Sequence, residues 1–428
     1  MSQYNPNRSF NLDRVEHLLN WLENPQKNFK SVLIAGTKGK GSTATVLSNI
    51  LLTSQYRVGT YTSPHLETER ERIQTNLKLS SQKDFIWGVK KIKSAFQKNK
   101  LSKKLGEVTY YEVFTILAFL IFAKNKIDIA VVEVGMGGRL DATNVLEPIV
   151  SVLSSISYDH MEQLGNTLTK IAKEKAAIIR NSGIVVSSYQ EPEVINVLKK
   201  QVQLKKALWK LEGRDFSFSL KNISSAGMKF TYSLKGSKPL LLETKLIGEF
   251  QCENISLAIT IGYDLKKLGF SKITTQNIRK AVKRVVWPGR FEIVTQKPWV
   301  VLDGAHNGES MRAFVQGIKK VFSKSTLLPI ISLSEGKDLK RIWPELSRVT
   351  EKIIVTQTPQ TRSAKALDLI KSLDHQFKQV SVASSLKQAL TLAKIQATPK
   401  DVVMVTGSLF LVAEGKKLEK RDKELCLK

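Results

Sequence analysis

Short apolar runs alternate with segments of helical spacing along most of the chain. The apolar runs predict buried strands of parallel sheets, and they lie at 31–35, 58–61, 127–134, 149–154, 184–187, 299–302, 327–332, 353–356 and 402–406. Spacings of three and four residues predict helices at 12–23, 42–52, 109–124, 167–179, 191–204, 249–268, 275–284, 310–322, 363–372 and 385–395. The alternation predicts an α/β fold with mostly parallel sheets.

Two stretches interrupt this pattern. Residues 216–248 alternate apolar and polar side chains, which predicts a small antiparallel patch. The polar segment 62–79 has no clear period and is interpreted as a loop. The sequence VVWPGR at 285–290 indicates a boundary. We therefore expect an N-terminal P-loop-type domain over 1–287 and a C-terminal Rossmann-like domain over 288–428.

Length and charge narrow the class of protein. The 428 residues exceed one ordinary domain, and no apolar run reaches the roughly 18 residues of a membrane span. The net charge of +29 suggests that the protein binds nucleic acid. The lysines are dispersed, however, and no nucleic-acid-binding motif accompanies them, so we expect no nucleic-acid partner. The N-terminus has no signal-peptide pattern, and two cysteines form no framework, which favours the cytoplasm.

The chain's most informative stretch is SVLIAGTKGKGSTAT, at residues 31–45. A strand, a glycine loop and a helix together cradle phosphates, because glycine lets backbone N–H groups approach the anion. Lys40 would reach the terminal phosphates, and Ser42 would hold magnesium. The spacing differs from the common GxxxxGK[ST] motif, and the alternative is a plain glycine turn that opens a helix.

Chemistry-bearing residues follow several other predicted strands. Glu133 lies near the end of the run 127–134, where we expect a carboxylate beside a phosphate loop to hold magnesium; the alternative is that the glycines after it merely form a turn. His160 follows the run 149–154 and could be a ligand, a proton carrier or a structural histidine. Ser63 could bind metal or form a turn. The lysines at 170–175 are interpreted as solvated helix charges, so physics alone does not select Lys175.

The second half repeats this arrangement more weakly. Asp303 and His306 follow a strand in DGAHN, Arg290 lies at the boundary, and Ser408 follows the last strand. None is diagnostic alone. Together they mark the strand ends of a domain that would face the first one.

These motifs in this order resemble the Mur ligase superfamily, specifically its folylpolyglutamate synthase and dihydrofolate synthase branch. The similarity runs from LDRVEHLL to GSLFLVAE, and the motifs that carry it are GTKGKGS, TSPHL, TYYEVFT, EVGMGGRLDATN, DHMEQLGNTLTKIAKEKA, PGRFEIV, LDGAHN and the Gly336–Asp338 turn.

The resemblance implies a role for each matching position. It implies a nucleotide phosphate loop at Gly39, Lys40, Gly41 and Ser42. It implies magnesium ligands at Ser42, Ser63, Glu133 and His160, with two magnesium sites, and a CO₂-derived carbamate on Lys175, whose oxygens suit magnesium. The positions implied for ATP, glutamate and phosphate are Asn254, Arg290, Asp303, His306 and Ser408.

The resemblance also implies a pterin pocket. Its lining would be Phe10, Thr109, Tyr110, Tyr111, Glu112, Leu140, Asp141 and Ala142, with Tyr111 placed for stacking. The stretch GGRLDATN resembles enzymes that use dihydropteroate. Three departures concern loop geometry: Lys38 replaces the usual asparagine, Ala177 and Arg180 replace the usual glycine and lysine, and Asn76 lacks its following glycine.

The implied reaction is ATP-dependent ligation of L-glutamate to dihydropteroate and to the γ-carboxylate of folates, through an acyl phosphate, by a monomer. The alternatives are a folylpolyglutamate synthase without the first activity, a cell-wall Mur ligase, and a nucleotide-binding regulator. A cell-wall enzyme usually carries a further N-terminal domain, and a regulator should lose Glu133, His160 or Lys175.

Overall fold

The computed structural model describes residues 12–99, 101–373 and 375–426. The chain forms two compact units. The N-terminal unit runs to Ser219 and also contains Phe230–Leu242 and Gln251–Val285. The C-terminal unit contains Leu220–Lys229, Glu243–Phe250 and everything from Val286 onward. The α/β prediction is confirmed, since each unit has its own mostly parallel sheet.

The N-terminal unit is built on an eight-stranded sheet of order β4-β3-β2-β5-β1-β6-β7-β8. Its strands are β1 Lys30–Ala35, β2 Val58–Tyr61, β3 Ile73–Thr75, β4 Lys78–Leu79, β5 Ile129–Glu133, β6 Val150–Leu153, β7 Ile184–Ser187 and β8 Leu208–Leu211. The neighbouring strands in the part of the sheet ordered β2-β5-β1-β6-β7-β8 are parallel. β3 pairs antiparallel with β2, and β4 pairs antiparallel with β3.

The register of this sheet aligns the ends of three strands. Ile34 of β1 lies opposite Glu133 of β5, and Ala35 lies opposite Leu153 of β6. The segments that follow β1, β5 and β6 therefore leave the sheet at one edge. This is the edge at which parallel α/β sheets bind ligands.

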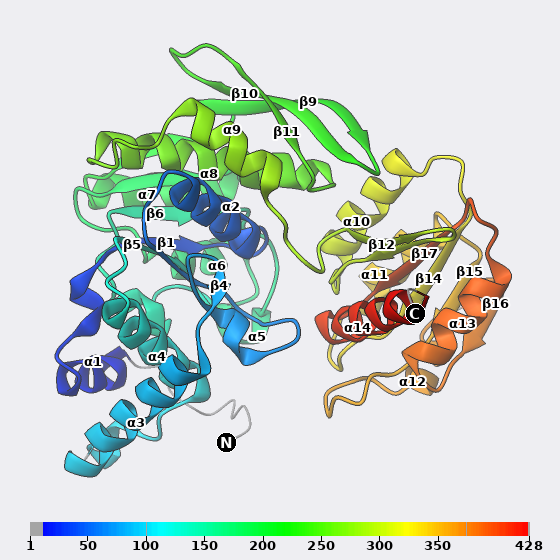
Figure 1. Ribbon diagram of the computed structural model, residues 1–428, viewed down its shortest axis with the longest axis horizontal. Helices are drawn as coiled ribbons and strands as arrows, with labels where there is room; N and C mark the ends of the chain where they lie inside the picture. Colours follow the sequence, from blue (N-terminus) through cyan, green and yellow to red (C-terminus); the bar gives the residue numbers. More distant parts are fainter. Residues whose placement is uncertain (1–11, 100, 374, 427–428) are drawn as a thin grey trace. The chain divides into compact units, whose positions relative to one another are not determined.

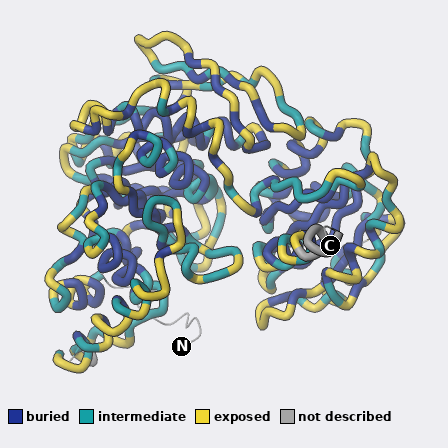
Figure 2. The backbone as a smooth tube through the Cα atoms, viewed as in Figure 1, coloured by how far each residue is buried: buried dark blue, intermediate teal, exposed yellow. Residues whose placement is uncertain are grey.

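Helices cover both faces of the sheet, whose central strands are buried (Figure 2). On one face, α1 Leu12–Trp21, α4 Tyr110–Lys124, α6 Leu168–Ala176 and α7 Pro192–Leu204 share one core with Leu33 and Val132. On the other face lie α2 Lys40–Thr53, α8 Glu249–Lys267 and α9 Thr275–Arg284 (Figure 1). Two further helices are α3 Gln82–Lys98 and the short α5 Met161–Leu164.

A three-stranded sheet of order β11-β10-β9 forms the predicted patch. Its strands are β9 Phe216–Ser224, β10 Gly227–Leu234 and β11 Leu240–Thr244. Two residues connect β9 to β10, and so tight a connection makes that pair antiparallel.

The C-terminal unit has a six-stranded sheet of order β12-β13-β17-β14-β15-β16. Its strands are β12 Glu292–Gln296, β13 Trp299–Leu302, β14 Leu327–Ile331, β15 Lys352–Val355, β16 Gln379–Val382 and β17 Val402–Thr406. In this sheet β12 and β13 are antiparallel, and the other neighbouring strands are parallel. The helices are α10 Gly308–Val321, α11 Leu339–Ser347, α12 Ala366–Lys371, α13 Leu386–Gln396 and α14 Leu409–Cys426.

The loop prediction for 62–79 is wrong in part. A 3₁₀ helix at Glu69–Arg72 precedes β3 and β4, and β3 pairs with β2. β3 and β4 have only three and two residues, which is too few for an alternation of apolar and polar residues to be recognised. The hydrophobic pattern also does not predict α3, α5, α11, α14, β8, β12 and β16. In α3, lysines outnumber the three buried positions, Gly88, Ile92 and Ala95.

Candidate active site

The glycine loop between β1 and α2 is closely packed. Gly39 precedes α2 with φ of 82°, a left-handed conformation that favours glycine. A Cβ at Gly39 would lie 2.1 Å from Asn254 Oδ1, and a Cβ at Gly36 would lie 1.9 Å from Ser154 Oγ. No side chain caps the start of α2 at Gly39. The first backbone N–H groups of α2 can therefore donate hydrogen bonds to a bound anion.

Lys40 joins this loop to β5. Its Nζ donates to the Gly36 carbonyl oxygen at 3.2 Å and lies 3.9 Å from Glu133 Oε1. Glu133 is buried at the end of β5, and its Oε2 accepts a hydrogen bond from the Ser63 backbone N–H at 3.1 Å. Ser42 is buried in the first turn of α2. The register of the sheet thus places Lys40, Glu133 and Ser63 together.

Lys175 comes to the same loop from α6. Its Nζ donates to the Gly36 carbonyl oxygen at 3.0 Å, and the residue is 4 % exposed. Burial, followed by the charge of Lys40, lowers the pKa of Lys175 to about 7. A lysine whose pKa lies near neutrality has a substantial neutral amine fraction, which is the nucleophilic form. Helix periodicity gave no signal for this residue; the family motif alone selected it.

The turn after β6 also contacts the loop. The Thr37 N–H donates to the Ser155 carbonyl oxygen at 2.7 Å, and Lys38 Nζ lies 3.6 Å from Asp159 Oδ2. His160 follows with φ of 50°, at the start of α5, and its side chain is half exposed. The structure therefore brings the His160 turn to the phosphate loop.

The predicted pterin residues that the structure describes lie at the start of α4 and in the turn after β5. The Tyr111 hydroxyl donates to Asp141 Oδ1 at 3.4 Å, and the Tyr111 ring centroid lies 6.1 Å from that of Tyr61. Asp141 is buried, which raises its carboxyl pKa, and it accepts hydrogen bonds from Thr143 and from the Met136 N–H. Ala142 is buried and Leu140 half-buried.

Three other members of this predicted set have local roles. Glu112 is buried in an ion pair with Arg14, with Nη2 to Oε1 at 2.6 Å. Glu112 also accepts from the Thr109 N–H, while Thr109 Oγ1 accepts from the Glu112 N–H, so the two cap α4. The Tyr110 ring packs on Phe114 at 4.5 Å between centroids. Phe10 lies outside the described residues.

The C-terminal unit gathers its predicted residues at the ends of β13 and β17. Asp303 is buried, which raises its pKa against the lowering effect of Arg290, and it accepts from the N–H groups of Phe291 and Ala305 at 2.8 Å each. His306 Nδ1 lies 2.7 Å from the Gly304 carbonyl oxygen. Ser408 Oγ accepts from the Leu411 N–H at 3.1 Å, which caps α14.

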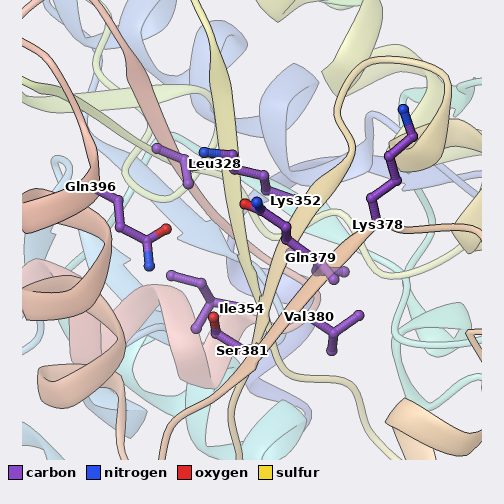
Figure 3. A pocket seen from close by; sticks show the side chains of 9 residues that line it. Leu328, Lys352, Ile354, Lys378, Gln379, Val380, Ser381 and Gln396 are labelled. Atoms are coloured by element: carbon purple, nitrogen blue, oxygen red, sulfur yellow. The ribbon is translucent and has the colours of Figure 1, made fainter.

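A pocket of about 520 Å³ lies elsewhere in the C-terminal unit, beside β15, β16 and the end of α13 (Figure 3). It is lined by Leu328, Lys352, Ile353, Ile354, Lys378, Gln379, Val380, Ser381 and Gln396, and none of these is a predicted site residue. Within the described ranges, no three His, Cys, Asp or Glu side chains cluster as a metal site would. The helices of those ranges include none that is both long and apolar enough to cross a membrane.

Comparison with known proteins agrees with these motifs. Residues 34–262 match the Mur ligase middle domain, and residues 289–409 match the Mur ligase, glutamate ligase domain. A dihydrofolate synthase/folylpolyglutamate synthase of Bacillus subtilis (strain 168) is 30% identical over 95% of this chain and 94% of its own length. A probable dihydrofolate synthetase of Schizosaccharomyces pombe is 32% identical over 96% of this chain and 98% of its own.

Solved structures agree as well. The Mycobacterium tuberculosis folylpolyglutamate synthase complexed with ADP and AMPPCP has a TM-score of 0.89 at 28% identity, over 96% of this chain and 95% of that one. E. coli FolC in complex with DHPP and ADP has a TM-score of 0.86 at 28% identity, over 97% and 94%. The domain matches and these relatives show that the chain is an ATP-dependent ligase of the Mur ligase superfamily. Within it, this chain belongs to the dihydrofolate synthase and folylpolyglutamate synthase family.

Proposed function

We propose that this chain ligates L-glutamate to dihydropteroate, forming dihydrofolate, and to the γ-carboxylate of folates, using ATP. The observation that carries the proposal is the convergence of Lys40, Glu133 and Lys175 on the loop Gly36–Gly39. The relatives named for both activities, which this chain matches over nearly its full length, support the substrate pair.

The proposed reaction begins at the phosphate loop. N–H groups at the start of α2 and the Lys40 ammonium would bind the phosphates and stabilise charge on the transferring phosphoryl group. The substrate carboxylate attacks the γ-phosphorus, ADP leaves, and the acyl phosphate forms. The neutral amine of glutamate then attacks the acyl carbon, and phosphate leaves. Asn254, which contacts Gly39, and Arg290, Asp303, His306 and Ser408 are proposed to bind ATP and glutamate.

The donor set fits magnesium in part as it stands. The Glu133 carboxylate and the hydroxyls of Ser42 and Ser63 are the hard oxygen donors that magnesium prefers, and His160 adds an imidazole. The Lys175 ammonium cannot bind a cation. Its low pKa supports carbamylation, in which the neutral amine bonds to CO₂ and releases a proton. When bound, in two proposed sites, magnesium would neutralise phosphate charge.

The pterin end of the site is proposed at Tyr111, Asp141 and their neighbours Thr109, Tyr110, Leu140 and Ala142. The hydrogen bond between Tyr111 and Asp141 supports this, because it fixes a ring and a carboxyl group beside each other. Phe10 and Glu112 complete the proposed lining, although Glu112 is already paired with Arg14.

We also propose domains at 1–287 and 288–428, a monomer, no nucleic-acid partner and a cytoplasmic location. The end of the N-terminal unit at Val285 and the start of the C-terminal match at 289 support the boundary, although 220–229 and 243–250 belong to the C-terminal unit.

The decisive experiment measures ADP release with ATP, Mg²⁺ and L-glutamate, with dihydropteroate or tetrahydrofolate as the acceptor. Glutamate-dependent release with both acceptors supports the bifunctional proposal. Release with tetrahydrofolate alone would make the chain a folylpolyglutamate synthase only. Release with neither acceptor would refute the substrate assignment.

A further inference from the structure

The phosphate loop and the turn after β6 are joined by a series of polar contacts. Besides the bond from the Thr37 N–H to Ser155, Thr37 Oγ1 donates to the Ser157 carbonyl oxygen and accepts from the Ser157 N–H, both at 3.0 Å. The Lys38 N–H also donates to the Ser155 carbonyl oxygen at 3.3 Å. The backbones of the two segments are therefore held in fixed register up to residue 157.

Beyond residue 157 the link passes through side chains. Lys38 Nζ lies 3.6 Å from Asp159 Oδ2, and the other carboxylate oxygen, Oδ1, accepts from the His160 N–H at 3.0 Å. The same Oδ1 lies 4.0 Å from His160 Nε2. One carboxylate thus bridges the loop lysine and both the backbone and the ring of His160.

We propose that Lys38 is a positioning residue, which acts through Asp159 to hold His160 against the phosphate loop. The inference rests on the proposed function, because that function includes His160 among the magnesium ligands. His160 has a left-handed φ of 50°, a conformation that few non-glycine residues adopt, so the contacts around this turn must help to hold it. The Asp159 carboxylate supplies an orientation that the backbone does not.

The exposure of the pair decides what kind of effect to expect. The Lys38 and Asp159 side chains are 25 % and 21 % exposed, so solvent screens their attraction. Losing the pair should change the melting temperature little. It should instead change how well His160 is placed, and so how the site binds a divalent cation with nucleotide.

The test is a double-mutant cycle with Lys38→Asn, Asp159→Asn and the double variant, together with Lys38→Arg, which keeps the charge. Mn²⁺ binding in the presence of ADP is measured by isothermal titration calorimetry, and the melting temperature is measured alongside. We expect each single substitution to weaken Mn²⁺ binding roughly tenfold, the double variant to be no weaker than either single one, and Lys38→Arg to keep most of the affinity. Lys229→Asn, which removes an exposed lysine paired with Glu243 on the small sheet, is the matched control.

Three results would overturn the inference. Additive losses in the double variant would show that Lys38 and Asp159 act independently. Weaker ADP binding in Lys38→Asn without Mn²⁺ would make Lys38 a direct phosphate contact. Unchanged Mn²⁺ binding in the Lys38→Asn and Asp159→Asn variants would show that the pair does not position His160.

The same measurements separate this inference from the proposed function. A chain without ligase activity that still shows the coupling would refute the proposed function and support the positioning role. A chain that binds neither ADP nor Mn²⁺ would refute both.

Discussion

Lys175 Nζ and Lys40 Nζ both donate to one acceptor, the Gly36 carbonyl oxygen, at 3.0 and 3.2 Å. Two lysine side chains that share an acceptor repel each other when both are charged. Lys175 is the more deeply buried of the two, so it carries the larger cost of desolvation. Burial and the neighbouring charge of Lys40 both lower the pKa of Lys175, which favours its neutral amine.

The first prediction concerns Lys40. Lys40→Ala should lower the rate of ADP release by at least about 10²-fold, because it removes the charge that faces the transferring phosphoryl group. The measurement is coupled ADP release at saturating ATP. Lys30→Ala is the control, since Lys30 begins the same strand β1 but is exposed. Near-normal release by Lys40→Ala would contradict the phosphate-loop assignment.

The second prediction concerns pH and Lys175. Its folded pKa of about 7 lies below the ordinary 10.5, so between these values the unfolded chain binds more protons. The free energy of unfolding should therefore rise with pH from about 7 toward 10.5. Below about pH 7 the buried Lys175 side chain is charged in the folded protein, so the free energy of unfolding is lowered by the full cost of burying that charge. Lys175→Met should remove this rise and stabilise the protein at neutral pH.

The measurement is urea unfolding between pH 6 and 10 in CO₂-free buffer, so that carbamylation does not interfere. Lys173→Met is the control, because Lys173 lies on α6 but is exposed. Parallel pH profiles for the wild type and Lys175→Met would show that Lys175 keeps an ordinary pKa.

The third prediction concerns Gly39. Gly39→Ala should combine left-handed strain of roughly 1–2 kcal/mol with displacement of the Asn254 amide, which would raise the KM for ATP. Gly236→Ala is a matched control, because Gly236 has a similar φ of 77° and nothing within 4 Å of its Cβ position. Unfolding free energies and ATP kinetics are measured for both.

Adding Asn254→Ala to Gly39→Ala should relieve the clash and leave a stability loss like that of Gly236→Ala, measured against Asn254→Ala alone. An equal loss from Gly39→Ala in both backgrounds would mean that the Asn254 contact is unimportant.

The fourth prediction concerns the buried pair of Arg14 and Glu112. Either Arg14→Ala or Glu112→Ala should cost roughly 3–5 kcal/mol, because each leaves a buried charge without its partner. Lys124→Ala removes the exposed partner of Asp84 and should cost less than about 1 kcal/mol. The measurement is urea unfolding. A small stability loss in Glu112→Ala with a large rise in the KM for dihydropteroate would instead favour a substrate role for Glu112.

Much of the fold could be predicted because buried strands and helices require apolar residues at regular positions in the sequence. The central strands β1, β2, β5 and β17 are buried apolar runs, and their bounds agree with prediction to within a few residues. Edge elements carry a weaker signal. β3 and β4 are too short for a pattern, and β16 has exposed Val380 and Val382 where a buried run would be expected.

For the site, the sequence by itself determined which residue types stand at strand ends and in which order, because strand, glycine loop and helix are local patterns. Only the tertiary structure decided their chemistry. Lys175 follows Gly36 by 139 positions, and its low pKa arises from burial by elements distant in the sequence. Glu112 shows the same limit, because its partner Arg14 lies 98 positions away on another helix. Desolvation and ion pairing depend on three-dimensional neighbours, and a linear pattern does not contain them.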